Sequence, residues 1–379
     1  MAAAKTANNT GNPGGPGISG GAKRPARLLN LDLLRLVSAL MVLAYHYGFR
    51  MGNTGDGGGA AFPELAPLAI WFDAGLLIFF AISGYVIALS AENRTAYDFA
   101  AGRLARLWPT FVLCATVTAL VMHAWPFPGM EPPGVKQWLA HFVILSRALG
   151  EPFLDGAYWT IAYEIIFYGW VFVLIASGGF ARHWRGFVLA WLLVSVANEG
   201  LIDSGILRKL LITQYSGYFA FGLALFRTQR EPDAASWPVV ALAGLWACAT
   251  PFIVEPLFVA AYGVERSVWG LCLMGPFALA AVTLCATART LPVPPGLAIG
   301  LGGLTYPLYL LHQNIGYSVF TRFGPEFGRW PVAVALLAGL LLLAWLLARF
   351  WEPPARRAIV AASRRLRARL GGVMRHEPA

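Results

Sequence analysis

Residues 330–351 read WPVAVALLAGLLLLAWLLARFW, and the first charged side chain in this stretch is Arg349. A helix needs about 20 apolar residues to cross a bilayer, so this stretch alone is long enough for one span. Counting it, the apolar runs of the chain lie at residues 28–49, 66–90, 104–124, 157–177, 186–201, 209–227, 237–256, 267–288, 296–320 and 330–351. The sequence therefore predicts about ten transmembrane helices.

The composition of the 379 residues agrees with this pattern. Hydrophobic residues make up 58% of the chain and charged residues 13%, and the mean hydropathy is +0.60, whereas a soluble protein carries about 25% charged residues. So few charges cannot cover the surface of a soluble globule of this size. The composition excludes a soluble enzyme, a disordered chain and a fibrous protein. It predicts an all-α, polytopic helical membrane protein.

The basic residues predict the orientation of the chain, whose formal net charge is +10. They gather before the first apolar run and after the last one. These flanking residues are Lys5, Lys23, Arg24, Arg27, Arg356, Arg357, Arg364, Arg365, Arg367, Arg369 and Arg375. Basic flanks mark the cytoplasmic side of a membrane, so we expect both termini in the cytoplasm. The basic residues do not form a single patch with interspersed aromatic residues, which is typical of nucleic-acid binding. We therefore expect no nucleic-acid partner.

Composition and charge divide the chain into three segments: a leader, a membrane domain and a tail. Residues 1–27 are rich in Gly, Pro, Ala and Asn and predict a disordered cytoplasmic leader without the apolar region of a removable signal peptide. Residues 28–352 form the membrane domain. Residues 353–379 form a basic cytoplasmic tail, which as an amphipathic helix would suit an anionic lipid surface. Within the membrane domain, residues 138–149 are amphipathic but too short to span, and predict an interfacial or re-entrant helix.

The cysteines carry no sign of metal or redox chemistry. They lie inside apolar runs and lack the paired spacing of zinc or thiol–disulfide motifs. The four positions are Cys114, Cys248, Cys272 and Cys285. We expect them to be small buried side chains, and we expect no metal.

Ionisable side chains inside a membrane span are costly and therefore mark functional candidates. In the first run, Arg35 and His46 are eleven residues apart, which places them on one helix face, within about 20° of each other and about 16 Å apart along the axis. Asp32 can pair with Arg35 at i, i+3. A single membrane histidine is often a structural hydrogen-bonding group between helices, but the arginine on the same face favours a functional role.

The second and third runs carry further candidates. Ser83 lies in the sequence FFAISGY at residues 79–85, where small residues also permit close helix packing. Arg103 and Arg106 share a face at the cytoplasmic end of the third run. They either anchor the helix at the inner surface or clamp phosphates, which arginine binds through bidentate charge-assisted hydrogen bonds.

The fourth and ninth runs each contain a polar stripe. Thr160, Glu164 and Tyr168 follow one another at i, i+4 and therefore share one helix face. A carboxyl group at this depth is either neutral or functional, because desolvation disfavours its charged form. Tyr309 and His312 share a face of the ninth run near its outer half. They are either structural hydrogen-bonding groups or part of a site.

Taken in order, these motifs resemble acyltransferase family 3 of integral membrane proteins over about residues 28–320. Each motif alone is weak, but five in the same order are hard to obtain by chance. They are Leu31-Asp32-x-x-Arg35 with His46, which gives an Arg-x10-His spacing; Phe79-Phe80-x-x-Ser83-Gly84-Tyr85; Arg103-x-x-Arg106; Trp159-Thr160-x-x-x-Glu164-x-x-Phe167-Tyr168; and Tyr306-x-Leu308-Tyr309-x-x-His312.

The resemblance implies transfer of an acyl group, usually acetyl, from cytosolic acetyl-CoA to a hydroxyl of a cell-surface glycan or lipid-linked glycan, in the bacterial inner membrane. It implies that His46 is catalytic, either as a general base or through an acyl-imidazole. We expect Glu164 to orient or stabilise the His46 ring. Binding of the acyl-CoA donor is expected at Arg35, Arg103 and Arg106. Substrate contacts are expected at Ser83, Trp159, Tyr163, Tyr309 and His312.

Two other functions fit the same apolar bulk. A transporter or flippase for glycans or small solutes would also carry polar residues in its spans, but the sequence has no internal repeat of the kind that marks secondary transporters. A structural partner in a polysaccharide export complex would not need the Arg-x10-His spacing. Substitution of His46 separates these alternatives, because only the enzyme depends on this side chain.

Overall fold

The computed structural model describes residues 26–288 and 293–373, which form helices and short connections with no β-strand. The long helices are α1 (Ala26–Tyr45), α4 (Ala74–Ala91), α5 (Ala96–Ala124), α7 (Tyr158–Ala176), α9 (Trp184–Ala197), α11 (Ser216–Arg230), α12 (Trp237–Tyr262), α13 (Val268–Thr287), α14 (Pro295–Phe327), α15 (Arg329–Leu346) and α16 (Glu352–Val373). The short helices are α2 (Met51–Thr54), α3 (Ala66–Ala69), α6 (Val135–Ala140), α8 (Gly179–Arg182) and α10 (Gly205–Leu210).

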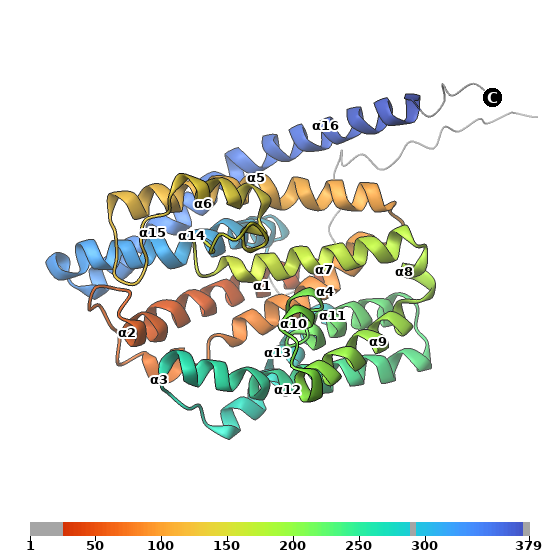
Figure 1. Cartoon of the computed structure of the whole chain (residues 1–379), viewed down its shortest axis with the longest axis horizontal. Helices are drawn as coiled ribbons and strands as arrows, with labels where there is room; N and C mark the ends of the chain where they lie inside the picture. Colours follow the sequence, from red (N-terminus) through yellow and green to blue (C-terminus); the bar gives the residue numbers. More distant parts are fainter. Residues whose placement is uncertain (1–25, 289–292, 374–379) are drawn as a thin grey trace, which may run out of the picture.

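Single turns of other helix types complete the structure. The π-helical turns η1 (His46–Arg50), η4 (Asn198–Ile202) and η6 (Leu347–Trp351) extend α1, α9 and α15, and the 3-10 turns are η2 (His141–Val143), η3 (Ser146–Leu149) and η5 (Ala234–Ser236). Most long helices run side by side along one direction, with α2 and α3 at one end of the bundle and α8 at the other (Figure 1).

Among the described residues, eight helical segments are long and apolar enough to cross a membrane. They are Leu28–Thr54, Ala66–Ala91, Ala96–Ala124, Tyr158–Ala176, Trp184–Ile202, Ala234–Tyr262, Val268–Thr287 and Arg329–Arg369. The other two predicted spans correspond to α11, which has 15 residues, and α14, which has polar side chains through its middle. The prediction of a multi-pass, all-helical membrane protein is confirmed. The count of ten spans and the cytoplasmic position of the termini stay predictions.

Two predicted segments are wrong in their extent. The run at residues 209–227 is divided between α10 and α11, because Ile212 has a positive φ of 53°, which a right-handed helix excludes. Residues 138–149 form the end of α6 and two 3-10 turns rather than one helix, and Ile144 between them has a φ of 42°. Hydrophobic periodicity does not reveal such interruptions, since the residues involved remain apolar.

The two ends of the chain are described only in part. The predicted leader, residues 1–27, lies almost wholly outside the described residues. The predicted tail, residues 353–379, is helical in its described part, where α16 continues α15 through η6 and lies outside the bundle next to α5 (Figure 1). Arg367 of α16 pairs with Asp98 of α5 at 3.0 Å.

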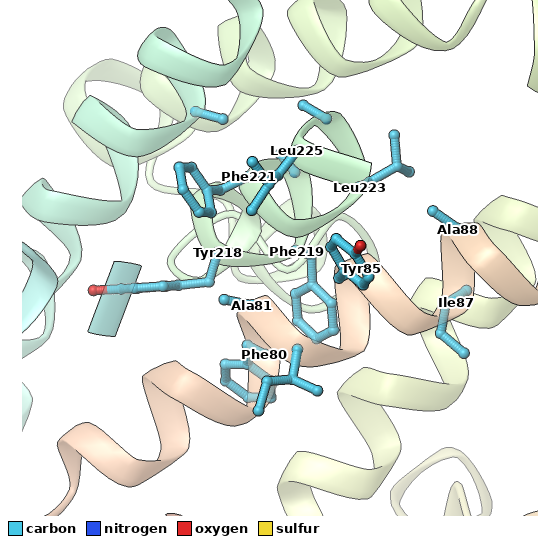
Figure 2. Close-up of a cluster of buried hydrophobic side chains, with 14 of the residues drawn as sticks. Phe80, Ala81, Tyr85, Ile87, Ala88, Tyr218, Phe219, Phe221, Leu223 and Leu225 are labelled. Atoms are coloured by element: carbon cyan, nitrogen blue, oxygen red, sulfur yellow. The ribbon is translucent and has the colours of Figure 1, made fainter. Parts of the chain in front are cut away.

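Helices α4 and α11 are in backbone contact. A Cβ added at Gly84 would lie 2.1 Å from the carbonyl oxygen of Phe219, and one added at Gly222 would lie 2.0 Å from the carbonyl oxygen of Ala81. Figure 2 shows the labelled side chains that meet around this contact: Phe80, Ala81, Tyr85, Ile87 and Ala88 of α4, with Tyr218, Phe219, Phe221, Leu223 and Leu225 of α11. Small residues allow such close packing in lipid, so the glycine of the FFAISGY motif serves the fold.

Candidate active site

Helices α1, α4, α5, α7 and α14 together line one pocket. Its empty space is about 670 Å³, including its opening. Most of the lining is apolar or hydroxyl-bearing, and three side chains are charged: Arg35, Arg106 and Glu164. The complete lining is Arg35, Leu76, Phe79, Phe80, Ser83, Arg106, Leu107, Thr160, Ile161, Glu164, Gly302, Thr305, Tyr306 and Tyr309.

The side chains that line this pocket differ in their exposure. Arg106 is exposed and the side chain of Arg35 is 14% exposed, whereas Thr160 and Tyr309 are buried. The hydroxyl oxygens of Thr160 and Tyr309 lie 2.9 Å apart and share a hydrogen bond. The pocket therefore has a cationic opening and a neutral, hydroxyl-lined inner part.

One turn beyond Tyr309 on α14, His312 meets His46, the first residue of η1, which continues α1. The Nδ1 atom of His46 lies 2.7 Å from the Nε2 atom of His312, and the two residues are 7% and 1% exposed. The ring centroids of Tyr309 and His312 are 5.5 Å apart. Tyr47 donates a hydrogen bond to the carbonyl oxygen of His312. Two histidines 266 positions apart in the chain thus form a buried pair next to the inner part of the pocket.

The face of α1 that carries Arg35 and His46 lies against α14, as the spacing of these two residues predicts. A Cβ added at Gly302 would lie 2.6 Å from Cβ of Asp32, and His312 contacts His46 at the other end. Arg35 forms the predicted ion pair with Asp32, with an N–O distance of 3.6 Å. Arg35 and His46 are eleven residues apart, which corresponds to about 16 Å along the helix axis at 1.5 Å per residue.

Glu164 faces the pocket but has other partners than the one we expected. Its carboxylate accepts a hydrogen bond from Ser83 Oγ at 3.2 Å and another from the Tyr168 hydroxyl. The ring nitrogen of His46 is bonded to His312 instead. The predicted polar stripe on α7 is present, but the expected support of the His46 ring by Glu164 is not found, because α7 directs this carboxylate toward α4.

The two arginines of the Arg-x-x-Arg motif have different surroundings. Arg106 lines the pocket at its opening. The guanidinium of Arg103 lies over the ring of Tyr168, 5.9 Å from its centroid, and Tyr168 in turn donates to Glu164. The arginines of the pocket lining are thus Arg35 and Arg106, and donor binding by Arg35, Arg103 and Arg106 stays a prediction.

The residues predicted to contact substrate also divide into two groups. Ser83 and Tyr309 line the pocket. Trp159 and Tyr163 pack instead against Tyr215 of the turn before α11, with ring centroids 5.6 and 6.1 Å apart. Several lining residues had no role assigned from the sequence, although helical spacing from Glu164 and Tyr309 would have reached them. These are Thr160, Thr305 and Tyr306.

Within the described ranges, no group of three or more His, Cys, Asp and Glu side chains is arranged to hold a metal ion. The chemistry of the site rests on imidazole, guanidinium, carboxylate and hydroxyl groups inside a helical membrane domain. This combination defines a membrane protein with a buried histidine pair next to a pocket that two arginines and one glutamate line.

Comparison with known proteins identifies the family. Residues 28–349 match the acyltransferase domain of acyltransferase family 3, and the chain belongs to this family. It is similar to an O-acetyl transferase of Shigella phage Sf6, with 36% identity over 92 residues, which is 23% of this chain and 24% of the phage protein. The match thus spans about a quarter of that relative. No solved structure matches the chain.

Proposed function

We propose that the protein is an O-acyltransferase of the bacterial inner membrane, which moves an acetyl group from cytosolic acetyl-CoA to a hydroxyl of a cell-surface glycan or glycolipid. Membership of acyltransferase family 3 and the similarity to an O-acetyl transferase support the acyl transfer. The observation that carries the proposal is the buried His46–His312 pair, which adjoins the neutral end of a pocket with Arg35 and Arg106 in its wall.

The charges of the pocket favour an anionic donor. Arg35 and Arg106 face the pocket together with one carboxylate, Glu164, which is already held by Ser83 and Tyr168. A guanidinium within a membrane domain is costly unless an anion or water compensates it. Asp32 supplies such an anion for Arg35, and the phosphates of acetyl-CoA would supply one for Arg106 through charge-assisted hydrogen bonds.

The depth of the site fits the shape of this donor. Arg35 and His46 are about 16 Å apart along the helix axis, and the pocket wall consists mainly of aromatic, aliphatic and hydroxyl-bearing side chains. The pantetheine arm of CoA is long, thin and uncharged. It can pass along this wall while the phosphates stay with Arg106, and the thioester then reaches the histidine pair.

The direct route needs only His46 as general base. Its imidazole accepts the proton of the acceptor hydroxyl while the hydroxyl oxygen attacks the thioester carbonyl carbon. A C–O ester bond forms and the C–S bond breaks. The CoA thiolate then takes the proton from the imidazolium, which regenerates neutral His46. Imidazole suits this exchange because its neutral ring accepts a proton and its cation donates one.

Two measurements in a heterologous bacterial host test the proposal. Mass spectrometry of surface glycans should show added acetyl groups when the wild-type chain is expressed and none with the His46→Gln variant at equal membrane abundance. Glycans with the same acetyl content in both strains would contradict the proposal. Solute uptake by vesicles that depends on the chain but not on His46 would favour the transporter instead.

A further inference from the structure

We infer that His312 is a positioning residue that holds the His46 ring in a single tautomer, with Nε2 unprotonated and able to accept a proton. The catalytic meaning of this tautomer rests on the proposed function. The tautomer itself follows from three groups in contact, the Tyr309 carbonyl and the rings of His312 and His46.

The direction of the hydrogen bonds is fixed by the carbonyl at one end. The Nδ1 atom of His312 lies 2.7 Å from the carbonyl oxygen of Tyr309, and a carbonyl oxygen only accepts hydrogen bonds. This nitrogen therefore carries the proton, and in a neutral ring Nε2 of His312 is an acceptor. Nδ1 of His46, 2.7 Å away, must then be the donor. The remaining nitrogen of His46, Nε2, keeps its lone pair.

The backbone around His312 is held so that this direction does not change. Tyr47 donates to the carbonyl oxygen of His312. Two residues earlier, the Tyr158 hydroxyl donates to the carbonyl oxygen of Leu310 at 3.2 Å. Two residues later, the N–H of Asn314 donates to Asp155 at 2.9 Å. Side chains from η1, from the start of α7 and from the segment before it thus fix α14 on both sides of His312. The ring that contacts His46 is correspondingly fixed.

This arrangement gives His312 a different role from the substrate contact that the sequence suggested. Its ring uses one nitrogen for the Tyr309 carbonyl and the other for His46, so it acts on the reaction through His46. The chain of hydrogen bonds ends on a carbonyl oxygen, which does not take up a proton at neutral pH. The positive charge that His46 gains therefore stays within the His46–His312 pair until the CoA thiolate takes a proton from His46 Nε2.

Nitrogen NMR of the full-length protein in lipid nanodiscs tests the tautomer without any assay of activity. With ¹⁵N-labelled histidine, protonated and unprotonated ring nitrogens give separate signals. The chain has six histidines, and comparison with His46→Gln identifies the signals of His46. We expect wild-type His46 to carry its proton on Nδ1, and the His312→Leu variant, which offers no acceptor, to lose this preference. A wild-type His46 protonated on Nε2 alone would overturn the inference.

Kinetics then test whether the tautomer matters for the reaction. In His312→Leu, kcat should fall about 100-fold or more while KM for acetyl-CoA changes less than about threefold. His312→Gln keeps an acceptor oxygen for His46, so its kcat should be at least about tenfold higher than that of His312→Leu. His141→Gln is the matched control, because His141 is also buried, with its ring bonded to Gln137 and Leu154, and it should retain kcat.

The outcomes of the two experiments separate the inference from the proposed function. Equal losses of kcat in the Leu and Gln variants of His312, with the His46 signals unchanged in both, would overturn the positioning role. A wild-type protein that transfers no acetyl group would instead contradict the proposed function, and the NMR signals of His46 in that protein would still decide the tautomer.

Discussion

Replacement of Arg106 by alanine should weaken binding of acetyl-CoA and leave the chemical step intact. Arg106 is exposed and lines the pocket, whereas His46 is buried and is not part of the pocket lining. A hydrogen bond to a charged group contributes about 1.5–3 kcal/mol, and exposure favours the lower end of this range. A loss of about 1.5 kcal/mol corresponds to about a tenfold rise in KM, with kcat changed less than about twofold.

Initial rates of CoA release from acetyl-CoA by the purified protein in nanodiscs measure both parameters. Arg322→Ala is the matched control, because Arg322 is also exposed and pairs with Glu326 at 3.7 Å on another part of α14, and its KM should match that of the wild type. Salt should raise the wild-type KM more than that of Arg106→Ala, since exposed charges are screened. An unchanged KM in Arg106→Ala, or an equal rise in Arg322→Ala, would refute the assignment of the donor phosphates to this opening.

Three further substitutions test the fold and the wall of the site. Gly84→Ala should cost at least about 2 kcal/mol of unfolding free energy, because its Cβ would lie 2.1 Å from the Phe219 carbonyl oxygen; an unchanged thermal unfolding midpoint would contradict the helix contact. Tyr309→Phe loses one hydroxyl but keeps the backbone carbonyl, so kcat should fall less than about tenfold, and complete loss would assign the hydroxyl a larger role. Arg367→Ala removes an exposed pair with Asp98 and should change the unfolding free energy by less than about 1 kcal/mol, as measured by denaturant unfolding.

The apolar pattern of the sequence predicts the helices well where a long apolar run forms one continuous helix. The run at residues 330–351, for example, lies on one continuous helix from α15 through η6. The same pattern fails at Ile212 and Ile144, where apolar residues take a positive φ. It also predicts a membrane span at α11, although this helix has 15 residues and neighbouring helices bury nearly all of them. Hydrophobicity alone does not distinguish a helix that faces protein from one that faces lipid.

The site was predictable along each helix and not between helices. The spacing of Arg35 and His46 correctly places both toward one neighbour, because 3.6 residues per turn holds along α1. Which side chain lies opposite depends on helix packing, and the sequence carries no local signal for it. For this reason Glu164 was expected at His46 but meets Ser83, and His312 was expected at the substrate but meets His46.

The central claim is that the buried His46 ring carries out acyl transfer, and single-turnover kinetics test it most directly. Purified wild-type protein and His46→Gln, both folded in nanodiscs, are mixed with radiolabelled acetyl-CoA and a surface-glycan extract, and labelled glycan is counted over time. The wild type should transfer the label, and the variant should be slower by about 100-fold or more at saturating donor. Transfer by the variant at the wild-type rate would contradict the account.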